Sequence, residues 1–260
     1  MAWARSLYAV IREDFLLLRK EKILLFFMLG LIVVTILARF VSEWSLDDPG
    51  IIFFNISHTA LRFVGTFIAL FFAIKILHDT KVSGNVETVL SRPVSKIVFL
   101  QGNFIALVAT LLLYGAIFGV GWYLISLAFS MNMSAEFLFW GSLFAVSEWI
   151  LMASVALFLA SICGFGMAFL ASYALWITGL VSGVLASSVE NMSSTSTLTP
   201  VASQVAKIWS LDRFSLIAYS RDWVMPDGGF IFYAIAYSVV GTMALLLLSS
   251  VCFACKDVAS

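Results

Sequence analysis

The hydrophobic positions of this chain gather in long blocks that are separated by shorter polar stretches. A helix that crosses a bilayer needs about 20 mostly apolar residues. Six blocks meet this length and are predicted as spans, at residues 23–41, 59–77, 98–128, 137–162, 167–187 and 230–254. The third block is too long for a vertical span, so we expect it to tilt or to emerge from the bilayer. The pattern predicts an all-α integral membrane protein, with a six-span transmembrane domain at residues 23–260.

The first 22 residues have the period of an amphipathic helix that lies along a membrane surface. Apolar residues recur at steps of three and four and form one stripe, made of Trp3, Leu7, Ile11, Phe15 and Leu18. Another face carries arginines suited to anionic lipid headgroups, namely Arg5, Arg12 and Arg19. Residues 1–22 are therefore predicted as a cytoplasmic amphipathic interfacial helix. The alternative is a generic basic flank of the first span.

The basic residues predict the orientation of the spans, because cytoplasmic loops are enriched in lysine and arginine. Ten of the 15 Lys and Arg residues precede the first span, border the connection between the second and third spans, or follow the sixth span. The opposite side has fewer, namely Lys207, Arg213 and Arg221, with Arg39 and Arg62 just inside the span ends. We therefore expect a multi-pass protein of the cell membrane with both termini in the cytoplasm, which would be the inner membrane of a Gram-negative cell.

Composition supports a membrane location and excludes several classes of function. Hydrophobic residues make up 62% of the chain and charged residues 12%, against about 25% charged residues in soluble proteins. A water-soluble enzyme is excluded, and 15 basic and 15 acidic residues leave no basic domain for nucleic acid. The cysteines Cys163, Cys252 and Cys255 lack a second ligand pair, so we predict no metal site and interpret them as small polarizable residues of the membrane domain.

The connection between the second and third spans contains a short apolar stripe, formed by Val82, Val86, Val89 and Leu90. Pro93 is expected to end this helix near Arg92, because the residue before a proline disfavours helical geometry. A short amphipathic helix of this kind suits docking in the groove of a partner protein. A solvated turn that merely joins two spans is the alternative.

Residues 84–96, Gly-Asn-Val-Glu-Thr-Val-Leu-Ser-Arg-Pro-Val-Ser-Lys, follow an acidic residue and continue into Phe-Leu-Gln-Gly-Asn-Phe at 99–104. This stretch resembles the ABC-2 type transporter permeases, in which an acidic, glycine-containing turn leads into an apolar helix and a Ser-x-Pro-x-Ser-basic sequence. The layout of an interfacial helix followed by six spans is also similar. The sequence departs from the family at Asn85, where a threonine is common, and at residues 163–166, which lack the charges often found in the second cytosolic loop.

The resemblance implies a function and a mechanism. The chain would be the permease subunit of an ABC exporter that moves a hydrophobic or amphipathic substrate, with a second copy forming a homodimer in the lipid membrane. Residues 79–96 would form the coupling helix, with ATPase contacts at Val82, Val86, Glu87, Val89, Leu90 and Arg92, and residues 163–166 would add a minor contact. The chain lacks the sequence G-x-x-x-x-G-K-[ST], so ATP is expected on separate ATPase subunits and the chain itself is expected to be neither an enzyme nor a cofactor carrier.

Glu148 lies about 11 residues into the fourth span, where an acid costs roughly 2.5–3.5 kcal/mol on insertion scales. Glu148 and Arg62 are candidates for the transport pathway or the dimer interface, and a protonated or hydrogen-bonded structural acid is the alternative for Glu148. Arg62 is the nearest partner in the topology, but it lies only about 5 Å inside the outer boundary of the second predicted span. We therefore expect a depth mismatch of roughly 10 Å to prevent a direct pair, and we expect Arg39 and Arg62 to reach toward the interface.

Two glycine pairs and one long loop complete the predictions. Gly115 and Gly119, like Gly179 and Gly183, have the spacing that lets helices approach closely, and we expect both pairs to pack within one subunit. In the outer segment, residues 188–229, a helix is expected to begin at Thr199 and Pro200 with the stripe Val201, Val205, Ile208 and Trp209. It is predicted to lie on, or dip into, the outer leaflet as a lid, with a passive connector as the alternative.

Other classes of function remain as alternatives. The second hypothesis is a non-transporting ABC-type membrane subunit that transmits ATPase work to a partner protein, or anchors one, on the extracytoplasmic or periplasmic side. A channel or secondary transporter would favour several intramembrane charges, and this sequence offers one central acid. An intramembrane enzyme is least supported, since no paired acids or histidine cluster share one depth.

Overall fold

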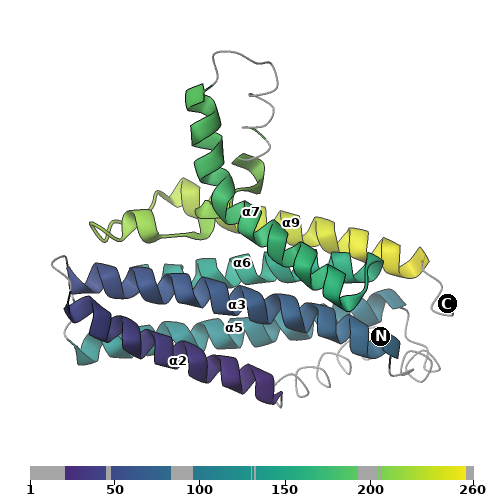
Figure 1. Cartoon of the computed structure of the whole chain (residues 1–260), viewed down its shortest axis with the longest axis horizontal. Coiled ribbons are helices and arrows are strands. Elements are labelled where there is room, and N and C mark those ends of the chain that lie inside the picture. The colour runs from purple at the N-terminus through teal and green to yellow at the C-terminus, as the bar shows by residue number, and fades with distance from the viewer. Residues whose placement is uncertain are drawn as a thin grey trace.

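The computed structural model describes residues 21–44, 48–82, 96–129, 131, 133–192, 204 and 207–255. Six long helices account for most of this part of the chain: α2 (Lys22–Glu43), α3 (Pro49–Val82), α5 (Lys96–Ala128), α6 (Ala135–Ile162), α7 (Phe165–Met192) and α9 (Gly228–Cys255). Two short 3₁₀ helices, η1 (Asp212–Phe214) and η2 (Ile217–Tyr219), lie between α7 and α9. The helices α3, α5, α6 and α9 run along roughly one common direction, whereas α7 crosses them obliquely and its end rises away from the bundle (Figure 1).

All six of these helices are long and apolar enough to cross a membrane. Each of them contains the whole of one predicted span. The prediction of an all-helical, multi-pass membrane protein is therefore confirmed. We call the end of the bundle at which α2 joins α3 and α5 joins α6 the predicted outer end, which lies on the left in Figure 1.

The start of α3 differs from the prediction by ten residues, because the helix begins at Pro49 and not near residue 59. Asp48 caps it: its Oδ1 accepts a hydrogen bond from the Gly50 N–H at 2.8 Å, and its carbonyl accepts one from the Ile51 N–H. An aspartate at the N-cap followed by proline at the first helical position is a strong start signal. The polar residues Asn55, Ser57 and His58 interrupt the apolar pattern, and the predicted span therefore began only after them.

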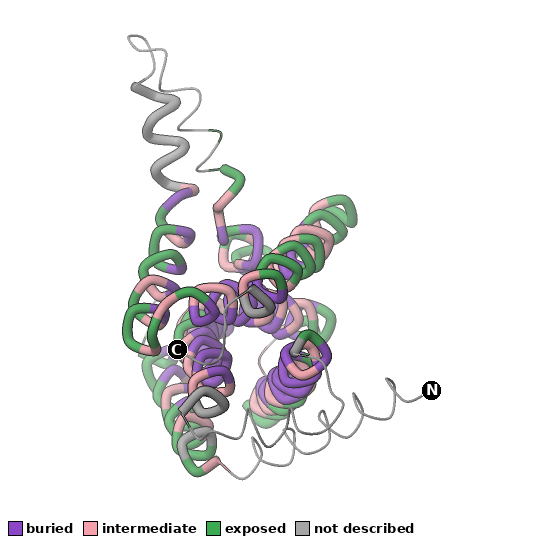
Figure 2. Tube along the Cα trace, turned by 90° about the vertical axis from the view of Figure 1, so that its right-hand side faces the viewer, coloured by how far each residue is buried: buried purple, intermediate pink, exposed green. Residues whose placement is uncertain are grey.

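Helix α6 is the centre of the bundle, in contact with α3, α5, α7 and α9. Its hydrophobic residues lie on all sides, as expected of a helix that is surrounded by other helices. Trp149 packs directly on Gly65 of α3, where an added Cβ would lie 2.0 Å from the indole. Figure 2 shows buried positions gathered where the helices face one another and exposed positions on the outside. The core is therefore built around α6.

Both glycine pairs pack within the chain, as predicted. Gly115 and Gly119 of α5 approach α6, where added Cβ atoms would lie 2.1 Å from Val146 and 3.0 Å from Ser142. Gly179 and Gly183 of α7 do not face another spanning helix. They face the outer segment at Leu211 and Asp212, with Cβ distances of 2.6 and 1.9 Å. The second pair therefore makes room for a loop.

Several predictions fall outside the described residues and stay predictions. The interfacial helix is one, because the structure describes only Glu21 and Lys22 near it. The coupling residues Val86, Glu87, Val89, Leu90 and Arg92 also lie outside, while Val82 is the last residue of α3. The same holds for the expected helix start at residues 199–201 and for Val205.

Candidate functional site: a buried charge network

Arg62 of α3 and Glu148 of α6 form a buried ion pair in the bundle. The Arg62 Nε donates to Glu148 Oε2 at 2.6 Å, and its Nη2 donates to Oε1 at 3.1 Å. The arginine side chain is 8% exposed and the glutamate side chain is fully buried. The expectations that a depth mismatch would separate the two groups and that Arg62 would reach for the interface were wrong.

The early start of α3 explains why the two charges meet. Arg62 follows Pro49 by 13 residues, and Glu148 follows Ala135 by 13 residues. Both helices begin at the predicted outer end, so each charge lies about 20 Å along its helix at a rise of 1.5 Å per residue. The sequence-based depth of Arg62 was counted from residue 59, and this error alone produced the apparent mismatch.

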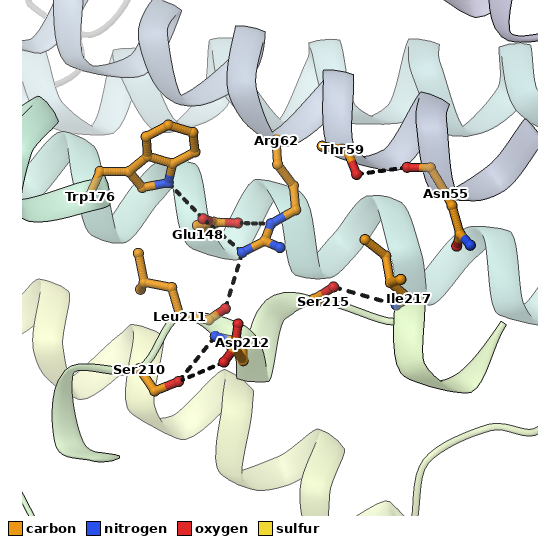
Figure 3. A network of polar contacts seen from close by, with 10 residues as sticks. All are labelled: Asn55, Thr59, Arg62, Glu148, Trp176, Ser210, Leu211, Asp212, Ser215 and Ile217. Atoms are coloured by element: carbon orange, nitrogen blue, oxygen red, sulfur yellow. Dashed lines mark hydrogen bonds and ion pairs between the residues drawn. The ribbon is translucent and has the colours of Figure 1, made fainter. Parts of the chain in front are cut away.

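A third side chain completes the surroundings of the carboxylate. Trp176 of α7, itself fully buried, donates from Nε1 to Glu148 Oε1 at 2.8 Å (Figure 3). The rings of Phe63 and Trp176 pack in a T-shaped arrangement, with centroids 4.7 Å apart. A buried charge is stable only when it is paired and hydrogen-bonded. Glu148 meets both conditions, so the geometry fits a structural acid, and both of its oxygens are occupied.

The same arginine also holds the outer segment. Its Nη2 donates to the carbonyl oxygen of Leu211 at 3.1 Å, and the Leu211 N–H donates to the carbonyl of Gly179 at 3.0 Å. We call Arg62, Glu148, Trp176 and the Leu211 main chain the buried charge network. It joins α3, α6, α7 and the outer segment at one point (Figure 3).

A second arginine fixes the fold of the outer segment. Arg213 donates to three main-chain carbonyls, those of Lys207 (2.6 Å), Ile208 (3.2 Å) and Ser210 (2.7 Å). Its guanidinium also lies 4.0 Å above the centre of the Tyr237 ring of α9. These contacts fold residues 207–213 around one charge and attach them to α9.

Residues 207–220 of the outer segment pack into the bundle. Leu211, Phe214 and Leu216 are fully buried, and Ser220 donates to the Asn55 side chain of α3 at 2.9 Å. Of the predicted stripe, Trp209 bonds to the Leu175 carbonyl of α7 at 2.9 Å, whereas Ile208 is 63% exposed. Residues 207–220 therefore pack on α3, α6, α7 and α9, and the choice between a lid and a passive connector stays a prediction.

Aromatic rings close the predicted outer end of the bundle. The ring of Phe54 lies 5.0 Å from Phe137 and 6.1 Å from Trp223, and it stacks on His58 at 5.1 Å. Trp223 has a positive φ of 51°, a strained conformation for a tryptophan that costs on the order of 1–3 kcal/mol. The neighbouring rings hold it there. No sequence signal indicated this strained turn.

The remaining basic groups in the described spans lie near the ends of the bundle. Arg39 pairs with Glu43 at 2.6 Å and lies 4.5 Å above the Phe129 ring, as expected of an arginine at the interface. Lys75 pairs with Glu21 at 2.5 Å, which ties the start of α2 to α3. Within the described ranges, no three His, Cys, Asp or Glu side chains gather where they could hold a metal ion.

A comparison with models of known protein families and a comparison with curated proteins found no match to this chain. The assignment of function therefore depends on the sequence motif and on the geometry described above. In the buried charge network both oxygens of the Glu148 carboxylate accept hydrogen bonds, and Arg62 links α3 to the outer segment.

Proposed function

We propose that this chain is the transmembrane subunit of an ATP-driven ABC exporter for a hydrophobic or amphipathic substrate. A separate ATPase would act on the connection between α3 and α5, and two copies of the chain would form the path. On this proposal the predicted outer end faces away from the cytoplasm. The function rests on the resemblance of residues 84–96 to the ABC-2 type permeases, joined to one feature of the fold.

That feature is the continuity of α3. The helix runs without a break from Pro49 to Val82, so it begins at the outer end and ends at the first residues of the proposed coupling helix. Arg62 lies 20 residues before Val82, which is about 30 Å along the helix axis. A helix of this length transmits a displacement as a rigid body far better than a loop can.

The buried charge network would receive this displacement. If an ATPase moves the Val82 end of α3, then Arg62 moves with the helix and pulls on Glu148 and on the Leu211 carbonyl, to which it is bonded. Interfaces of this kind change between discrete arrangements because packed cores do not deform continuously. Movement of the outer segment would then open or close the exit for the substrate.

The second candidate function is a non-transporting subunit that passes ATPase work to a partner protein on the outer side. It is supported by the firm attachment of the outer segment together with exposed apolar side chains on it, Ile208 at 63% and Val224 at 59%. In this case the outer segment would bind protein. The two candidates share the ATPase and differ in whether substrate crosses the membrane.

The experiment is a coupling assay on the complete complex, purified from its source membranes and reconstituted in liposomes. The variants Val86→Asp and Leu90→Asp place charge on the apolar stripe. We expect these variants to hydrolyse ATP without driving the efflux of a hydrophobic dye. Thr88→Asp, on the opposite face of the same predicted helix, is the matched control and should keep the coupling. Unchanged coupling in the stripe variants would contradict the docking role, and ATP hydrolysis without any efflux in the unmodified complex would favour the second candidate.

A further inference from the structure

A groove of about 490 Å³ lies between α5 and α6 on the outside of the bundle. Its lining includes Gly119, Val120 and Tyr123 of α5 and Ala135, Phe139 and Ser142 of α6. Gly119 and Ser142 form part of its floor, because the missing side chain at Gly119 lets the two helices approach. The volume is within the range of about 300–1,000 Å³ that is typical of ligand sites.

The groove has the length of one bilayer leaflet. On α5 it extends from Leu112 to Tyr123, a distance of about 17 Å at 1.5 Å per residue. On α6 it extends from Ala135, the first residue of the helix, to Val146. Half of a hydrocarbon core of about 30 Å is about 15 Å. The groove therefore begins at the predicted outer end and stops near the middle of the membrane.

The lining is almost entirely apolar, and its rim faces the surroundings of the bundle. Val120 and Phe139 are each 59% exposed, and Leu112 is 47% exposed. Both helices are candidate spans over this stretch, and α6 is longer than the hydrocarbon core requires, so hydrocarbon surrounds the groove below its outermost turn. An occupant must then be an apolar chain that enters from the side or from the outer end.

The charge at the mouth of the groove selects among lipids. Glu136 follows the lining residue Ala135 in the first turn of α6, is exposed, and forms no ion pair with any other described residue. A carboxylate in this position attracts a positive group at the level of the lipid headgroups. The neighbouring aromatic rings of Phe139 and Trp140 add a surface that favours an ammonium ion.

We propose that this groove binds one acyl chain of a phospholipid with an amine-bearing headgroup, taken from the leaflet at the predicted outer end. The acyl chain lies between α5 and α6, and the ammonium group lies at Glu136. This site is separate from the buried charge network and does not depend on an ATPase. A retained lipid here would support the contact of α5 with α6 at the two glycines.

The test is photolabelling of the purified chain in vesicles. Two vesicle preparations carry the same photoreactive acyl chain, one on phosphatidylethanolamine and one on phosphatidylglycerol, and mass spectrometry locates the labelled residues. We expect label from the ethanolamine lipid at residues 112–123 and 135–146, at several times the level on the exposed face of α9 around Val240 and Met243. Equal labelling of the groove and of α9 would mean ordinary surrounding lipid and would overturn the proposal.

Variants separate the acyl chain from the headgroup. Ala116→Trp fills the groove and should lower the groove label at least about fivefold, which corresponds to about 1 kcal/mol of binding. Ile117→Trp, at the neighbouring exposed position outside the lining, should not. Glu136→Gln should remove the preference for phosphatidylethanolamine over phosphatidylglycerol while the acyl label remains.

Two further outcomes would overturn the proposal. Unchanged groove labelling in a folded Ala116→Trp variant is one, and Ala135→Trp at the mouth provides the same test if Ala116→Trp does not fold. The other is efficient disulfide formation between two copies that carry Ala116→Cys, since this would assign the groove to a second copy of the chain.

Discussion

The guanidinium of Arg62 donates a hydrogen bond to the carbonyl oxygen of Leu211, which lies 149 residues later in the chain. Through this bond and the ion pair with Glu148, one arginine of α3 contacts both the central helix and the outer segment. The arrangement makes α3 the physical connection between the predicted coupling loop and the predicted outer end.

The pair of Arg62 and Glu148 should behave as one unit in a double-mutant cycle. Arg62→Gln leaves a buried carboxylate without its cation, and Glu148→Gln leaves a buried guanidinium without its anion. We expect each single variant to lower the free energy of unfolding by about 3–5 kcal/mol, as found for broken buried pairs. The double variant should lose less free energy of unfolding than the two single variants lose together. Unfolding in mixed micelles measures all three values. Strict additivity would show that the two side chains do not interact.

Trp176 and Trp122 provide a matched comparison of two fully buried indoles. Trp176 donates to Glu148, whereas the Nε1 of Trp122 has no hydrogen-bond partner among the described residues. Trp176→Phe should therefore lose a hydrogen bond to a charged group, worth roughly 1.5–3 kcal/mol, in addition to its lost volume. Trp122→Phe should lose only the volume. Equal destabilisation of the two variants in the same unfolding assay would contradict the assigned bond.

Gly65 should tolerate no side chain, because the Trp149 indole occupies the space of its Cβ. We expect Gly65→Ala to separate α3 from α6 and to lower the yield of folded protein in size-exclusion chromatography, with a cost in the range of about 1–3 kcal/mol for overpacking. Gly121→Ala on α5 is the control, since nothing lies within 4 Å of its Cβ position. The packing around Trp149 would need revision if both variants folded equally well.

The orientation can be checked by labelling single cysteines in intact cells or sealed vesicles. Ser194→Cys should react with a membrane-impermeant maleimide from outside, and Ser83→Cys should react only after the membrane is opened. The physical reason is the excess of lysine and arginine on the side of Ser83. The reverse pattern of labelling would invert the topology and place the coupling loop outside the cell.

The spans were predictable from the sequence because the bilayer sets the length of an apolar helix, and each of the six helices contains the whole of one predicted span. The pairing of Arg62 with Glu148 was missed for a local reason. Polar residues at Asn55, Ser57 and His58 obscured the first turns of α3, although Asp48 and Pro49 carried the start signal.

Other parts of the site could not be predicted. The acceptor on the outer segment is the main-chain carbonyl of Leu211. Every residue has such a carbonyl, so the sequence does not indicate which one accepts the bond. The contact of Trp176 with Glu148 needs the packing of α7 on α6, which hydropathy does not specify. Glu148 itself was found from the sequence, because an acid at that depth requires a partner.

The central claim is that a nucleotide-hydrolysing partner acts on the loop at the end of α3. The most direct measurement is photo-crosslinking from a reactive amino acid placed at Val86 in source cells, with the same amino acid at Thr88 as the comparison. We predict that Val86 captures a protein with a P-loop and that Thr88 captures much less of it. Capture of no nucleotide-binding protein from Val86, in cells where the chain is inserted and intact, would contradict the account.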